Sequence, residues 1–440
     1  MPRNIPLFLT TLLSVVLCSS CSTLPAMQGR VRRLVAQGEA EQASLVFKRA
    51  SSGYGRNHEL LFFLDRGMVN HYAGHYEESI QDFERAKELY ETLFTQSISK
   101  KALTWIWNDY AQPYRGEDFE RAMLNLFQAM NFVALGKIDE ALVEARNVEL
   151  LLRRFNQQYG EQANVYKDDA FVRFLMGILY ESTGRSYDVN DAFVSYRTAL
   201  EVYGGDYAKF YDLKAPLLLK ENLLSATQWM GAADLKQYQS AFPDVPVKSM
   251  AERGDSAQVY VILYRRMIAN KVQSTIFLPG IDGYLTRISF PKYRNVFQSS
   301  KEMALEAKNI EGKIFRSEFQ QAEDLNAIAK KNLEDRRLRI AAKAVVRPVA
   351  KQLVFEGIED KIHEKAGDTA GELVRYAGMA YVAFSEEADT RSWETLPAEI
   401  RVARLILDAG TYEFFVEGER IGSLTVTSGD QKFLIHWTMK

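Results

Sequence analysis

Cys21 is the residue whose surroundings most clearly suggest a chemical modification. It follows a positively charged start, Met-Pro-Arg, then an apolar run over residues 5–17, and then Cys18, Ser19 and Ser20. These are the parts of a secretory signal peptide, and the apolar run is shorter than the roughly 20 residues that span a bilayer. A cysteine directly after small residues is typical of a bacterial lipoprotein box. We therefore expect Cys21 to become the lipidated N-terminus.

Cleavage before Cys21 removes residues 1–20 as a signal peptide and leaves residues 21–28 as a lipid-anchored linker. Cys18 stands where lipoprotein boxes usually carry leucine, so an ordinary secretory signal cut near Ala26 is the alternative. A redox role for Cys18 and Cys21 is disfavoured, because the pair lies within the signal and one member is discarded.

The loop Ala388–Pro397 holds the second group of chemically capable side chains. Asp389 and Arg391 are close enough in sequence to form an ion pair, and the indole of Trp393 can anchor the loop in the core. A contact with a ligand or partner is the alternative. Catalysis would need a nucleophile, or a poised acid and base with supporting residues, and the sequence shows neither.

His71 and His75 have the spacing of two metal ligands on one helix face. Gly74 and Tyr76 fit a turn between two helices, which would separate the histidines, and no glutamate lies between them as in the metalloprotease motif. We also find no phosphate-binding glycine loop, no serine-centred elbow and no zinc spacing. The sequence therefore predicts no catalytic, cofactor or metal site.

The composition bounds the class of protein. The chain has 440 residues, of which 47% are hydrophobic and 25% charged, with a formal net charge of -2. Such a chain is globular, has room for two or three domains, and carries no nucleic-acid signature in its overall charge. Its two cysteines are both in the signal region. No small-molecule ligand is indicated either.

Helical repeats are predicted for residues 29–245. In the clearest unit, small and aromatic residues fall where a tetratricopeptide repeat (TPR) places its packing residues: Gly67, Gly74, Tyr76, Phe83 and Ala86. Small residues let two antiparallel helices approach, and the aromatic rings fill the space between them. Weaker units lie at about 38–50, 119–150 and 168–203. We expect an α-helical, TPR-like solenoid.

A repeat array of this kind has a concave surface suited to peptides or partner proteins. Polar side chains on one predicted helix are the candidates for that surface: Arg121, Asn125, Gln128 and Asn131. An ordinary solvated helix surface is the alternative for these residues.

The C-terminal part, residues 255–440, reads as strands, then helices, then strands. Strand patterns occur at 257–264, 274–278 and 285–290, and return at 400–437. The helical insertion covers about 322–385. We therefore expect an α+β chain in which the helical array precedes a β-sandwich-like domain with inserted helices.

Four blocks of this sequence resemble the uncharacterised bacterial lipoproteins that join TPRs to a C-terminal mixed domain. The blocks are Tyr114–Arg121, Ala192–Leu200, Glu323–Ala329 and Ala388–Pro397. The resemblance implies an envelope lipoprotein, often encoded beside small lipoproteins similar to peptidoglycan-synthase activators. It assigns no residue a role.

Together these patterns predict a lipid-anchored adaptor or scaffold that binds envelope proteins or peptides through its repeats. The first alternative is a structural spacer that holds the β domain against peptidoglycan or a larger envelope complex. The remote alternative is an enzyme with an unrecognised site. Ser22 after Cys21 favours the periplasmic face of the outer membrane, if the enterobacterial sorting pattern applies.

Overall fold

The structure is a computed structural model of the whole chain. It describes residues 23–49, 54–99, 112–159, 166–246, 256–279, 285–294, 302–336 and 387–439, together with the single positions 340 and 364. The predicted signal peptide, Cys21 and most of the predicted helical insertion lie outside the described residues.

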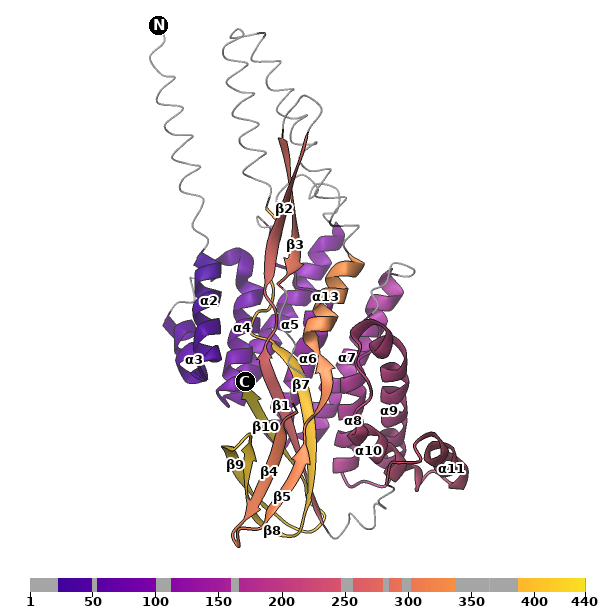
Figure 1. The fold of residues 1–440 in the computed structure, drawn as a ribbon. Helices are drawn as coiled ribbons and strands as arrows, with labels where there is room; N and C mark the ends of the chain where they lie inside the picture. Colours follow the sequence, from indigo (N-terminus) through magenta and orange to yellow (C-terminus); the bar gives the residue numbers. More distant parts are fainter. Residues whose placement is uncertain are drawn as a thin grey trace.

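The chain is α+β, as the sequence predicts. Helices make up the first half and strands most of the second half (Figure 1). Among the described residues, eight helices form hairpins of two: α2 (Thr23–Ala36) with α3 (Ala40–Arg49), α4 (Glu59–Tyr72) with α5 (Tyr76–Ser99), α6 (Asp118–Ala134) with α7 (Ile138–Tyr159), and α8 (Ala170–Ser182) with α9 (Asp188–Val202).

A glycine in the left-handed region of backbone space turns the chain within each hairpin. These glycines are Gly38, Gly74, Gly136 and Gly184, with φ of 85°, 79°, 71° and 65°. A side chain at such a φ clashes with the backbone, which explains why glycine ends the first helix of each pair.

The two helices of a pair pack through a small residue against an aromatic ring. A Cβ atom on Gly67 would lie 2.5 Å from Cε1 of Phe83, and one on Gly177 would lie 2.3 Å from Cε1 of Tyr196. Gly67 and Phe83, both named as packing residues from the sequence, are thus in contact between α4 and α5. After α9 follow a π-helix, η5 (Tyr203–Tyr211), and the helices α10 (Leu217–Thr227) and α11 (Ala232–Ala241).

The strands in the described part of the chain form three sheets. One has the order β10-β1-β7-β6, one has the order β5-β4-β8-β9, and β2 and β3 pair alone. Strand β1 runs parallel to β10 and antiparallel to β7. The bounds are β1 Ala257–Met267, β2 Lys271–Pro279, β3 Leu285–Tyr293, β4 Ala304–Asn309, β5 Ile314–Glu318, β6 Gln320–Asp324, β7 Pro397–Leu407, β8 Gly410–Val416, β9 Glu419–Val426 and β10 Gln431–Thr438.

The two four-stranded sheets bury their facing sides against each other. Val259 and Val261 of β1 share this core with Leu305 of β4 and Phe414 of β8. Alternate residues of β1 point to the opposite side, as the period of two in a strand requires. Tyr260, for example, belongs to the core formed with the helices.

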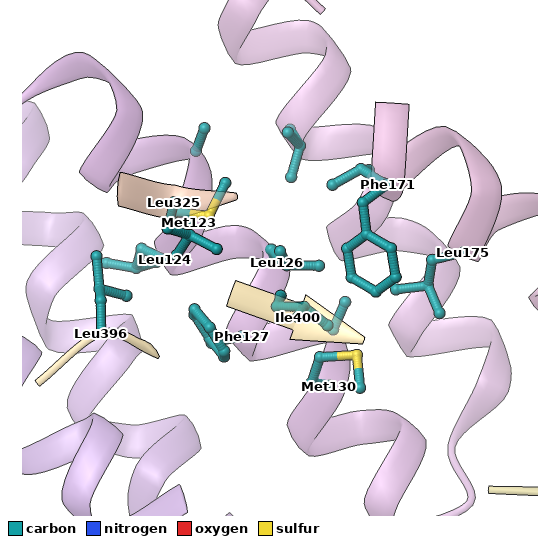
Figure 2. Close-up of a cluster of buried hydrophobic side chains, with 14 of the residues drawn as sticks. Met123, Leu124, Leu126, Phe127, Met130, Phe171, Leu175, Leu325, Leu396 and Ile400 are labelled. Carbon is teal, nitrogen blue, oxygen red and sulfur yellow. The ribbon is translucent and has the colours of Figure 1, made fainter. Parts of the chain in front are cut away.

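This second core joins the helical half to the sheet. Figure 2 shows Phe127 and Met130 of α6 and Phe171 of α8 converging on Ile400 of β7. Helix α13 (Leu325–Asp335) adds Leu325 to the same cluster. The predicted divide between 29–245 and 255–440 therefore does not separate two hydrophobic cores.

The start of the predicted helical insertion is corrected. Residues 322–324 belong to strand β6, where Gln320 pairs with Val402 of β7. The helix begins at Leu325, because the Asp324 side chain accepts the Ala327 backbone N–H and caps it.

Candidate functional site in the loop before strand β7

Residues 387–396 lead into β7 and lie among the helices. The side chain of Trp393 is 1% exposed. Its ring centroid lies 5.7 Å from that of Phe83 on α5 and 6.2 Å from that of Phe127 on α6. The indole N–H donates to Thr395 Oγ1 at 2.9 Å. Trp393 therefore anchors the loop, as expected, and presents no free surface to a partner.

Asp389 and Arg391 form the predicted ion pair. Arg391 donates from Nε to Asp389 Oδ1 and from Nη2 to Oδ2, both at 2.8 Å. The guanidinium also donates to the Gln112 carbonyl and lies over the Tyr114 ring. Burial opposes ionisation of Asp389, but the Arg391 hydrogen bonds hold the pKa of this carboxyl below its usual range.

Asp65 of α4 is a buried carboxylate that receives the end of the loop. Its Oδ1 accepts the Thr395 hydroxyl at 2.9 Å. Its Oδ2 accepts the Gln28 amide at 3.0 Å and the Tyr54 hydroxyl at 2.7 Å. Burial raises the pKa of Asp65, because its charged form loses contact with water. One carboxylate thus ties α2, α4 and the loop together.

Glu120 of α6 holds the middle of the loop. Its Oε1 accepts the Trp393 backbone N–H at 2.8 Å, and its Oε2 accepts the Tyr114 hydroxyl at 2.6 Å and the Glu117 backbone N–H at 3.0 Å. Burial raises the pKa of Glu120 to about 7. The carboxyl is enclosed, with no exposed surface, so it positions backbone instead of meeting a substrate.

Lys271 and Glu117 connect the loop to the base of the β2–β3 hairpin. Lys271, the first residue of β2, pairs with Glu117 and donates to the Arg391 carbonyl at 3.2 Å. Arg336, directly after α13, pairs with the same Glu117. These contacts hold the start of α6, the end of α13 and the hairpin base at one point.

The four side chains predicted to line an open groove do not line one. Gln128 and Asn131 are fully buried. Gln128 donates to Glu84 at 2.7 Å, and Asn131 donates to the Ser79 hydroxyl at 2.9 Å. This part of the prediction is wrong because α6 is a central helix that packs between α5, α7 and strands of the sheet.

The other two predicted groove residues are largely engaged within the helical part. Arg121 donates to Glu91 at 2.7 Å and lies over the Tyr90 ring at 5.0 Å from its centroid. Asn125 donates to the Arg121 carbonyl at 3.3 Å. Both side chains are half-buried, and these contacts occupy them within the helical part.

His71 and His75 do not share a helix face, because α4 ends at Tyr72 and α5 begins at Tyr76. The His71 ring hydrogen bonds to Asn131 Oδ1 at 2.6 Å, and burial lowers its pKa to about 4. Among the described residues, no group of three or more His, Cys, Asp or Glu side chains is arranged to hold a metal ion.

A pair of buried carboxyl groups, Asp169 and Glu323, lies where α8 meets β6. Asp169, the N-cap of α8, accepts the Val172 N–H and the Tyr166 hydroxyl, and Glu323 of β6 accepts the Tyr207 hydroxyl at 3.1 Å. Burial raises the pKa of both carboxyls, and Asp169 raises that of Glu323 further. The pair lies within the packed interior and contributes to the same junction of helices and sheet.

The sequence does not reveal Asp65, Glu120 and Lys271 as site residues, since nothing local marks them as partners of a loop that is remote in sequence.

None of the described helices has the length and apolar character needed to cross a bilayer.

A scan against protein-family models finds no match, and a search of curated proteins finds no similar sequence.

Proposed function

We propose that this protein is a lipid-anchored envelope scaffold that works as a rigid spacer and has no catalytic role. Its helical hairpins form a TPR-like array, and the inner side of that array is filled by the chain's own sheet and loop. The body is held at the periplasmic face of the outer membrane through Cys21.

The observation that carries this proposal is the position of the loop before β7. In repeat proteins that bind peptides, the concave face is free to receive the partner. Here Trp393 is enclosed between Phe83 and Phe127, and its backbone is bound by Glu120. Because part of the chain itself fills the inner side of the array, the helices are held in fixed positions, as a rigid spacer requires.

Two features support the TPR-like assignment. A small residue faces an aromatic ring across the pair in α4–α5 and again in α8–α9, where the rings belong to Phe83 and Tyr196. A glycine with positive φ turns each of the four hairpins. Both features follow the packing logic of helical repeats.

Affinity capture from crosslinked envelopes tests the proposal. We expect the protein to be recovered with sacculi or a large assembly, with crosslinked residues on outer surfaces of the helices. Stoichiometric capture of a soluble partner crosslinked to α4, α6 or the loop 387–396 would contradict the filled inner side. The Cys21→Ser variant is the control for membrane attachment.

An adaptor that uses an outer surface is the second candidate. Tyr187, the N-cap residue of α9, is 68% exposed, and Val194, seven residues later, is 37% exposed. Replacing both with serine would abolish partner capture if this face binds a protein. Replacing the exposed Leu45 on α3 is the matched control, because it removes an apolar side chain from a different face.

A further inference from the structure

The β2–β3 hairpin carries exposed apolar side chains away from the two cores. It pairs with neither of the other sheets, and it rises beyond the helices in Figure 1. Its base is fixed, because Lys271 is buried in its ion pair with Glu117 and Tyr293 is 8% exposed. Exposure then rises along β2 to 44% at Ile276 and 60% at Phe277.

The strands of the hairpin are cationic. They contain Lys271, Arg287 and Lys292 and no aspartate or glutamate, and Asp282 is the one acidic residue between them. Lys292 and Arg294 are exposed near the base, and Arg287 stands in register with Phe277. Exposed apolar side chains beyond a cationic base are the combination by which peripheral proteins bind anionic lipid: the apolar groups enter the interface and the cations meet phosphate.

The position of the expected lipid on Cys21 indicates that the hairpin faces a bilayer. Helix α2 begins at Thr23, at the end of the molecule from which the hairpin projects (Figure 1). Only Ser22 separates Cys21 from this helix. Two peptide units span at most about 7 Å, so a lipid on Cys21 places the bilayer at this end.

We propose that the β2–β3 hairpin is a second membrane contact that inserts Phe277 into the interface of an anionic phospholipid bilayer. This inference rests on the proposed lipid anchor, which decides the end that faces the membrane. The hairpin enters no deeper than the boundary between headgroups and acyl chains, because the unpaired edges of a two-stranded ribbon would lose their hydrogen bonds to water in hydrocarbon.

Fluorescence quenching on the lipidated full chain tests the contact. A Phe277→Cys variant is labelled with a nitrobenzoxadiazole dye and reconstituted into phosphatidylethanolamine–phosphatidylglycerol vesicles. The control is Ile310→Cys, which lies in the β4–β5 turn and is 89% exposed. That turn lies at the opposite end of the molecule (Figure 1).

We expect iodide quenching of the Phe277 label to fall several-fold on moving from detergent to vesicles, while quenching of the Ile310 label is unchanged. Charge reversal at Lys292 and Arg294, to glutamate, should restore part of the quenching. Equal quenching of the two labels in vesicles would overturn the hairpin contact.

The parent chain separates this result from failure of the anchor. After signal cleavage its one cysteine is Cys21, so an acylated parent takes up no dye. Labelling of the parent would refute the anchor alone. The quenching comparison is then repeated with Cys21→Ser in both labelled proteins, and protection of the Phe277 label there still supports the hairpin contact.

Discussion

Trp393 and the carboxylates around it show how single residues fix the loop before β7. The indole fills space between α5 and α6, Glu120 accepts the Trp393 backbone N–H, and Asp65 accepts the Thr395 hydroxyl. Each carboxylate would be costly to bury without donors, and each has several. These residues stabilise one position of the loop.

Trp393→Ala should lower the free energy of unfolding by about 3–5 kcal/mol, because it leaves a large cavity in a packed core. Trp229→Ala is the matched control, since that indole is 62% exposed and its loss should cost less than about 0.5 kcal/mol. Urea denaturation measures both. Equal effects of the two substitutions would contradict the anchoring role of Trp393.

Glu120 predicts a pH dependence of stability. Its pKa in the folded protein is about 7, raised from 4.5 by burial. The folded state therefore binds the proton more tightly than the unfolded state does. The contribution of protonated Glu120 to the free energy of unfolding is fully present below pH 4.5 and is lost as pH rises toward 7. The change is on the order of 3 kcal/mol.

Glu120→Gln should reduce the fall in unfolding free energy between about pH 5 and pH 7, measured by urea denaturation at a series of pH values. Glu394 also has a pKa raised to about 7 by burial, and it stays in both proteins, so the slope should shrink without vanishing. An unchanged slope would show that Glu120 does not titrate in this range.

The site residues that can be predicted from the sequence have partners nearby in the sequence, and those that cannot have partners far along the chain. Asp389, Arg391 and Trp393 can be predicted to pair and anchor because the ion pair lies within one short loop. Glu120 and Asp65 cannot, because their partners Trp393 and Thr395 are far away in sequence. A polar residue on a helix, such as Asn131, is predicted to be exposed unless the packing of the neighbouring helices is known.

At the level of elements, the helix pairs depend on close approach at small residues. The Gly67–Phe83 and Gly177–Tyr196 contacts leave no room for a methyl group. Such contacts can be predicted from spacing for α4–α5, because the two helices are consecutive. The contacts between helices and sheet cannot be predicted, since the strands are remote in sequence from the helices they contact.

Gly177→Ala should destabilise the protein by about 1–3 kcal/mol, because the new Cβ atom overlaps the Tyr196 ring. Gly204→Ala is the control, since the methyl group it adds would meet no atom within 4 Å and its φ is not positive. Thermal unfolding followed by circular dichroism compares the two. A Gly177→Ala protein as stable as the control would argue against tight packing of α8 on α9.

For the whole molecule, we expect a lipid tether at Cys21 on a chain whose helices and sheet share one of its two hydrophobic cores. Cys21→Ser should move the protein from the membrane to the soluble fraction, since each buried acyl CH₂ contributes about 0.8 kcal/mol to anchoring. Fractionation with palmitate labelling measures this. Membrane retention of the variant, with no label in the parent, would exclude the lipoprotein assignment.

The loop 387–396 packs against the helices, and we propose that this packing is permanent. Hydrogen exchange of the native protein, followed by mass spectrometry of peptides, measures how often the loop leaves the helices. We expect peptides covering 387–396 and α6 (Asp118–Ala134) to be protected together and to open with the same free energy. Fast exchange of the loop while α6 stays protected would show that the loop leaves the helices, and would contradict permanent packing.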